Sequence, residues 1–117
     1  MTPDRTRFIL VRPQHPGNVG ATARAMKVMG FSDLVLVCPP DRNVLSCEEA
    51  RARASGAVDV LEGAQVLDSL AEAFQGITFA CATAMTPRDF GPPTAAPREC
   101  MAALALQPLR VGFVFGE

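Results

Sequence analysis

One stretch of the chain combines residue types and spacing that suggest chemistry. A turn of proline, glycine and asparagine at residues 16–20 opens a helical segment, whose first backbone N–H groups could bind an anion. At about 100° per residue, Arg24 shares a helix face with the small residues Gly17, Gly20 and Ala21. We expect that face to be open and Arg24 to bind a phosphate or a developing oxyanion. The alternative is an ordinary solvated arginine.

The elements that would position these residues are those of an α/β fold. Apolar runs predict strands at residues 8–11, 34–37, 58–61, 77–82 and 111–115. Helices are predicted at residues 17–30, 46–54 (with Ser46 as its cap), 64–74 and 98–106. Strands without alternation, separated by helices, indicate a parallel sheet covered by helices on both faces. Ligands of such sheets bind beyond the carboxyl ends of the strands, here the loops at 12–18, 38–46 and 83–97 and the residues after Phe115.

The composition indicates one globular domain, residues 1–117. Hydrophobic residues make up 49% of the chain and charged residues 20%, which excludes a disordered protein. The net charge of −1 gives no general basic field, although residues 1–30 hold five basic residues against one acid. Four scattered cysteines and one histidine predict buried free thiols in a reducing cytoplasm and no metal site. We expect no signal peptide and no membrane span.

A dinucleotide-binding fold is one alternative. Asp41 lies 21 residues after Gly20, near the spacing of a ribose-binding acid. The glycines read G-x-x-G instead of G-x-G-x-x-G, and two prolines separate Asp41 from the preceding strand. The pattern therefore fits this alternative poorly.

The stretch from Phe8 to Arg24 resembles the first motif of the SPOUT-superfamily RNA methyltransferases, in particular the TrmH family and its TrmJ/LasT-like branch. The matching residues are Val-Arg-Pro, Pro-Gly-Asn-x-Gly and the arginine four residues later. The resemblance implies a ribose 2′-O-methyltransferase of RNA. It also implies that Arg24 contacts the RNA backbone and activates the ribose hydroxyl, and that Asn18 helps to shape the site.

Three further stretches resemble this branch. Residues 54–61 match a segment whose role there is mainly structural. Residues 81–88 match the end of a strand and the start of a loop, and in the family the backbone just after that strand lines the S-adenosyl-L-methionine pocket. The resemblance therefore implies cofactor contacts for Thr83, Ala84 and Met85, and residues 111–116 add Gly116. Residues 85–87 read Met-Thr-Pro where the tRNA enzymes tend to have Ala-Arg-Ser, which points to the LasT-like subgroup.

The family's third motif, which forms its knot, does not occur in the chain. We therefore expect the N-terminal part of a SPOUT-type domain, with the knot-forming C-terminal segment absent. The resemblance implies a homodimer that acts on RNA, with tRNA as the first choice, in the cytoplasm and without a metal. The main alternative is a nucleotide- or RNA-binding module that has no catalytic activity.

Overall fold

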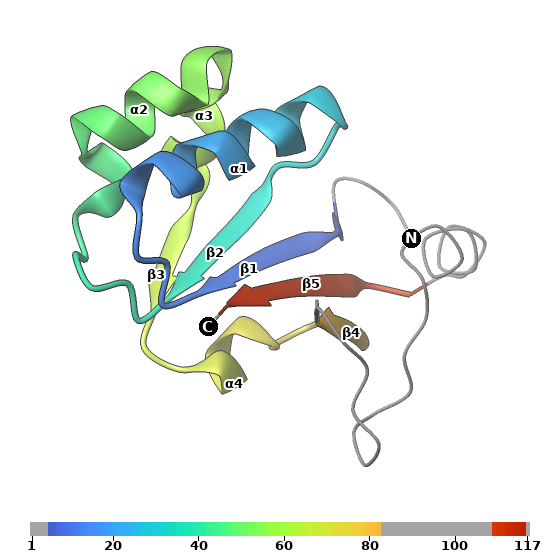
Figure 1. Cartoon of the computed structure of the whole chain (residues 1–117). Helices are drawn as coiled ribbons and strands as arrows, with labels where there is room; N and C mark the ends of the chain where they lie inside the picture. The colour runs from blue at the N-terminus through green and yellow to red at the C-terminus, as the bar shows by residue number, and fades with distance from the viewer. Residues whose placement is uncertain (1–4, 83–108, 117) are drawn as a thin grey trace, which may run out of the picture.

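The described part of the chain forms one parallel sheet. The computed structural model describes residues 5–82 and 109–116, so the predicted loop at 83–97 and helix at 98–106 lie outside it. The strands run in the order β3-β2-β1-β5-β4 (Figure 1). Their bounds are β1 Arg7–Val11, β2 Asp33–Val37, β3 Gln65–Leu67, β4 Phe79–Ala82 and β5 Val111–Gly116.

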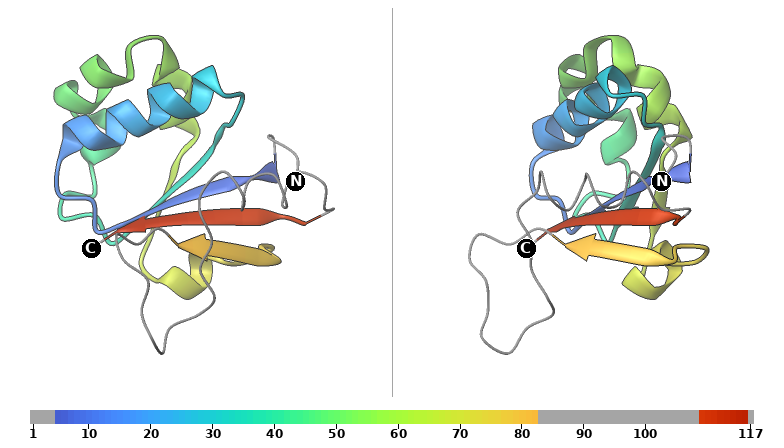
Figure 2. Two further views of the ribbon diagram at one scale, coloured as in Figure 1. Left: turned by 45° about the vertical axis from the view of Figure 1, so that its right-hand side comes forward. Right: turned by 90° about the vertical axis from the view of Figure 1, so that its right-hand side faces the viewer.

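Helices cover both faces of the sheet, as predicted. The longer helices α1, α2 and α3 lie together on one face, and the short helix α4 lies on the other (Figures 1 and 2). Their bounds are α1 Pro16–Val28, α2 Glu48–Ala54, α3 Val58–Gly63 and α4 Leu70–Ala73. Two single turns of 3-10 helix, η2 Val44–Ser46 and η3 Ser55–Ala57, flank α2.

The core follows from the alternation of side chains along the strands. In β1, Phe8 and Leu10 face the three-helix layer, whereas Ile9 belongs to a smaller cluster that includes Ala73 of α4. One stripe of α1 is buried: Val19, Ala23 and Met26. Both faces of the central strand are therefore covered, which explains its continuous apolar sequence.

Helices α1 and α2 approach each other closely at Gly20. A Cβ on Gly20 would lie 2.1 Å from the carbonyl oxygen of Ala50 and 2.9 Å from the amide nitrogen of Ala54. Only glycine leaves room for this contact, because both neighbouring atoms belong to the backbone of α2 and cannot rotate away. Gly20 therefore sets the distance between the two helices.

Two predicted elements are wrong in the middle of the chain. Residues 58–61 form part of α3 and not a strand, with Val60 and Leu61 turned into the core. Residues 64–74 form β3 and α4 instead of one helix. Strand β3 pairs with β2, and the Ser69 hydroxyl caps α4 by accepting a hydrogen bond from the amide of Glu72.

The predicted cap of the second helix is also wrong. Ser46 ends η2, where its hydroxyl donates to the carbonyl oxygen of Asn43 at 3.0 Å. Cys47 is the N-cap residue of α2, and its side chain makes no capping hydrogen bond. The acidic residues Glu48 and Glu49 occupy the first turn of α2, where their charge suits the helix dipole.

We predict that Gly20→Ala lowers the free energy of unfolding by about 2 kcal/mol or more, because the methyl group forces α1 and α2 apart. Gly63→Ala is the matched control, since a Cβ there meets nothing within 4 Å. It should leave the stability unchanged or raise it by up to about 1 kcal/mol. Urea denaturation followed by circular dichroism measures both. Equal stability of the two variants would contradict the close contact.

Candidate functional site

The carboxyl ends of the strands form the edge at which ligands of parallel sheets bind. The residues directly after β1 and β2, Arg12 and Cys38, both adopt a left-handed backbone with φ of 48°. The amide of Arg12 donates to Val37 at 2.7 Å, and the amide of Cys38 donates to Leu67 at 2.9 Å. The sheet hydrogen bonds therefore continue one residue beyond each strand before the chain turns away.

Gly116 lies at this same edge, at the end of β5. It pairs with Val11, and a Cβ on Gly116 would lie 2.8 Å from the Cβ of Val11. Glycine is thus required here by packing alone. The neighbouring strand β4 ends at Ala82, which pairs with Val114. Thr83, Ala84 and Met85 follow directly and lie outside the described residues. Strand β5, which ends at Gly116, and strand β4, which precedes Thr83, are therefore neighbours in the sheet.

The first turn of α1 starts beyond the carboxyl end of β1. His15 is the N-cap residue without a side-chain cap, and its carbonyl oxygen accepts from the amides of Asn18 and Val19 at 3.0 and 3.4 Å. Pro16 at the first position has no N–H. Few free donors therefore remain for the anion site predicted at this turn. The Asn18 side chain is exposed.

The predicted open face of α1 is wrong for its glycines. Gly17 and Gly20 are buried against α2, because small residues let the two helices approach. Arg24 and Ala21 do remain exposed. At 1.5 Å per residue, Arg24 lies about 12 Å along the axis from Pro16. Within one protomer, Arg24 is therefore separated from the strand ends at which Gly116 lies.

Arg53 of α2 was not among the predicted site residues. A shallow hollow beside α1 is lined by Arg24 of α1, by Arg53 of α2 and by small or apolar residues of α1 and its C-cap: Ala21, Ala25, Val28 and Met29. Val28 and Met29 are 82% and 56% exposed, unusually high for apolar side chains. The glycines of α1 led to the expectation of an open face, and nothing in the sequence identified α2 as the helix that packs against them.

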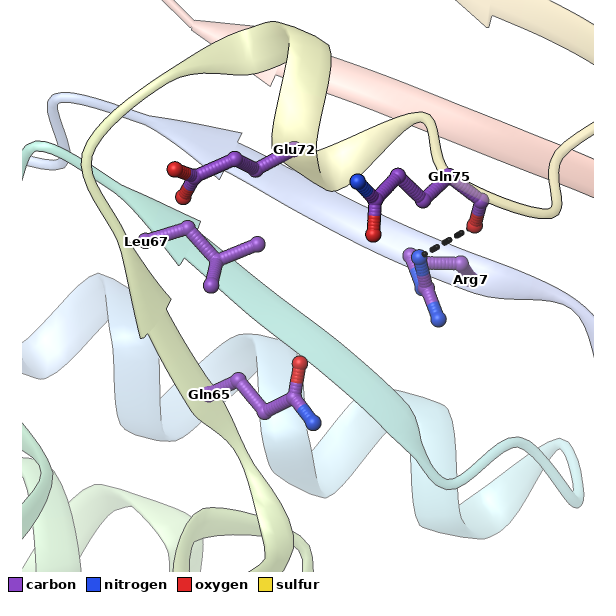
Figure 3. A pocket seen from close by; sticks show the side chains of 5 residues that line it. All are labelled: Arg7, Gln65, Leu67, Glu72 and Gln75. Carbon is purple, nitrogen blue, oxygen red and sulfur yellow. Dashed lines mark hydrogen bonds between the residues drawn. The ribbon is translucent and has the colours of Figure 1, made fainter.

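A second hollow, between β3 and α4, belongs to the structural framework. Figure 3 shows the residues that line it: Arg7, Gln65, Leu67, Glu72 and Gln75. The Arg7 guanidinium donates to Asp33 at 3.0 Å and to the carbonyl oxygens of Ala73 and Gln75 at 2.9 and 3.1 Å. These bonds join β1, β2 and the end of α4, so Arg7 has no free donor fork for a ligand.

Titratable groups elsewhere fit structural roles. Lys27 of α1 donates to both carboxylate oxygens of Asp59 in α3 at 2.9 and 3.0 Å, and this hydrogen bond lowers the pKa of Asp59. The link is therefore present near neutral pH and is lost as the pH falls through that lowered pKa.

Cys38 is exposed, which corrects the expectation that the thiols are buried, and its Sγ–H donates to the carbonyl oxygen of Asp68 at 2.9 Å.

Within residues 5–82 and 109–116, no three His, Cys, Asp or Glu side chains gather closely enough to hold a metal ion. In the same residues, no helix has the length and apolar character needed to cross a membrane.

The parallel sheet and the helix that follows its first strand define an α/β fold, in which ligands bind at the carboxyl ends of the strands. The comparisons with known proteins identify the family. A model of the SpoU rRNA Methylase family matches residues 5–117. The solved structure of TrmJ from Z. mobilis ZM4 superposes with a TM-score of 0.85 at 37% identity, covering 95% of this chain and 49% of that one. The chain belongs to the SpoU rRNA Methylase family, and its SPOUT-type fold is confirmed.

Two curated relatives carry names that state an activity. The tRNA (cytidine/uridine/adenosine-2'-O-)-methyltransferase TrmJ of Pseudomonas aeruginosa is 45% identical and covers 97% of this chain and 44% of its own length. The tRNA (cytidine/uridine-2'-O-)-methyltransferase TrmJ of Pectobacterium atrosepticum is 40% identical, covering 97% and 47%. The chain thus spans about half the length of these relatives. Neither the family match nor these relatives favour the dinucleotide-binding alternative. The Asp41 carboxylate, its predicted ribose contact, accepts a hydrogen bond from the backbone amide of Asn43 at 2.9 Å.

We predict that Arg7→Met lowers the free energy of unfolding by about 3 kcal/mol, because it leaves partly buried acceptors without their donor. Arg42→Met is the control, since Arg42 pairs with Asp68 at the exposed surface, where an ion pair contributes about 1 kcal/mol or less. Thermal and urea unfolding report both values. A similar decrease in the free energy of unfolding for both variants would show that the Arg7 hydrogen bonds do not stabilise the fold more than a surface ion pair does.

Proposed function

We propose that this chain is the N-terminal part of a methyltransferase domain that transfers the methyl group of S-adenosyl-L-methionine to a ribose 2′-hydroxyl of RNA in the cytoplasm. The exposed Arg24 on α1, in the family's first motif, is the observation that carries this proposal. The names of the relatives support tRNA as the substrate. Because those relatives are methyltransferases, a binding module without catalysis is not favoured.

The carboxyl edge of β4 and β5 fits the cofactor. These strands are adjacent and parallel, so their ends present backbone groups to the same space. We assign the cofactor contacts to Gly116 at the end of β5 and to Thr83, Ala84 and Met85, which follow β4. The cofactor supplies a methyl group on a sulfonium, an already activated leaving group. The protein therefore has to align the acceptor and help its hydroxyl to lose a proton, and no metal is required.

Arg24 is suited to the acceptor side of the reaction. Among the described residues, its side chain has no hydrogen bond or ion pair, so the guanidinium is available. A guanidinium can hold a phosphate oxygen pair in a forked geometry, and its charge favours ionisation of a nearby hydroxyl. Asn18, exposed in the first turn of α1, lies closer to the strand ends and helps to shape the approach of the ribose.

A homodimer would bring the separated parts together. Arg24 lies about 12 Å along α1 from Pro16, the first residue of the helix, which follows the carboxyl end of β1. The same face of α1 carries the exposed side chains of Val28 and Met29, which a second copy could cover. We infer that residues 12–30 take part in the dimer interface and that Arg24 of one protomer reaches the cofactor edge of its partner.

We predict that Arg24→Ala in the full-length enzyme lowers the rate of methyl transfer by roughly a hundredfold or more, the scale for loss of one electrostatic stabiliser. Arg24→Lys should recover part of the rate, because it keeps the charge but loses the fork. Single-turnover methylation of an unmodified tRNA transcript measures both.

Titration of each Arg24 variant with S-adenosyl-L-methionine provides the control. Affinity should stay near that of the unchanged enzyme, since the assigned cofactor contacts lie at other residues. Full activity of Arg24→Ala would disprove the assignment. A loss explained by weaker cofactor binding or by unfolding would make Arg24 a structural residue.

We also predict that Val28→Glu raises the dimer dissociation constant at least about tenfold, because it replaces apolar burial with a charge. Leu70→Glu is the control, as Leu70 is 37% exposed on α4 at the opposite face of the sheet. Sedimentation velocity over a range of protein concentrations gives both constants. A monomeric unchanged enzyme at micromolar concentration would contradict the dimer.

A further inference from the structure

Arg53 reaches the same hollow as Arg24 from a different helix. It lies near the end of α2 and is exposed. A Cβ built on Gly17 would meet the Cγ of Arg53 at 3.6 Å and its Nε at 3.8 Å. The Arg53 side chain thus lies across the start of α1, and it lines the hollow that also contains Arg24, two turns further along that helix.

Neither arginine of this hollow, Arg53 or Arg24, is in an ion pair or a hydrogen bond with any other described residue. Glu49 also lies beside Gly17, because a Cβ on Gly17 would lie 3.2 Å from the Oε1 of Glu49. Among the described residues, Glu49 forms no ion pair with Arg53. By contrast, Arg51 on the same helix pairs with Glu62 at 3.6 Å. The hollow therefore has two available guanidinium groups.

The chemistry of the hollow selects an anion that presents paired oxygens. Two guanidinium groups repel each other, and a phosphodiester between them would relieve the repulsion and accept hydrogen bonds from both. A second protein copy covering the arginines without an anion would enclose two unpaired cations, which is strongly unfavourable. Any contact through Val28 and Met29 should therefore leave the arginines at its rim, open to RNA.

We propose that Arg53 is a positioning residue that binds the phosphate backbone of the RNA substrate together with Arg24. This inference rests on the proposed function, because it takes RNA as the substrate. Arg53 would hold the strand against the start of α1, so that Arg24 meets the backbone beside the reacting ribose. Loss of Arg53 should therefore weaken RNA binding, and should raise KM more than it lowers kcat.

The test uses the full-length enzyme and an unmodified tRNA transcript over a series of salt concentrations. Arg53→Gln should weaken binding roughly three- to tenfold and reduce the slope of log affinity against log salt by about one. Arg53→Lys should keep the slope, since it keeps the charge. Arg51→Gln, on the same helix but with its charge already paired, should change neither value.

Three results would overturn the proposal. The first is an unchanged salt slope for Arg53→Gln, and the second is an equal change for Arg51→Gln. The third is a shift in the dimer constant of Arg53→Gln without a change in RNA affinity, which would assign Arg53 to the interface between copies. RNA binding by the unchanged enzyme without methyl transfer would refute the proposed function alone, because the salt slopes would still test the phosphate site.

Discussion

The close approach of α1 to α2 at Gly20 is the constraint on which the arrangement of the candidate site depends. It brings the backbone of α2 against α1 and leaves one side of α1, with Arg24, facing outward. The same contact places Arg53 across the start of α1. A larger residue at position 20 would move α2 and, with it, the second arginine. The spacing of the two charges is thus set by a residue without a side chain.

The two parts of the proposed active site lie in different places for a physical reason. Backbone ends of parallel strands converge at one edge and suit a small cofactor, which needs shape and hydrogen bonds. A helix that returns along the sheet carries its side chains away from that edge, and Arg24 lies about 12 Å along it. The proposed RNA substrate is long enough to reach both places, either within one protomer or across two copies of the chain.

The sequence predicted correctly the strands that are covered on both faces and the long helix α1. Strands β1, β2 and β5 are apolar because they are covered on both sides. Helix α1 is long and ends at Val28, two residues before Gly30, whose φ is 88°. The predictions failed where tertiary contacts overruled local preference. The β-branched Val58 and Val60 suggested a strand but lie in α3, and residues 65–67 became a strand by pairing with β2.

The candidate site was predictable only in part, for a related reason. The motif identified Asn18 and Arg24, but helical spacing alone could not tell a face that is open from one that is packed. Gly17 and Gly20 are small because α2 lies against them, and Arg53 enters from that helix. Residues that approach from another element leave no periodic signal near the motif, so they emerge only from the fold.

The most direct test of the account is to identify the product. The full-length enzyme is incubated with unmodified tRNA and labelled S-adenosyl-L-methionine, and the RNA is digested to nucleosides for mass spectrometry. A ribose 2′-O-methyltransferase leaves label in a 2′-O-methylated nucleoside, and the labelled methyl group is lost together with the ribose on glycosidic cleavage. Label on a base, or RNA that binds without acquiring label, would contradict the proposed function.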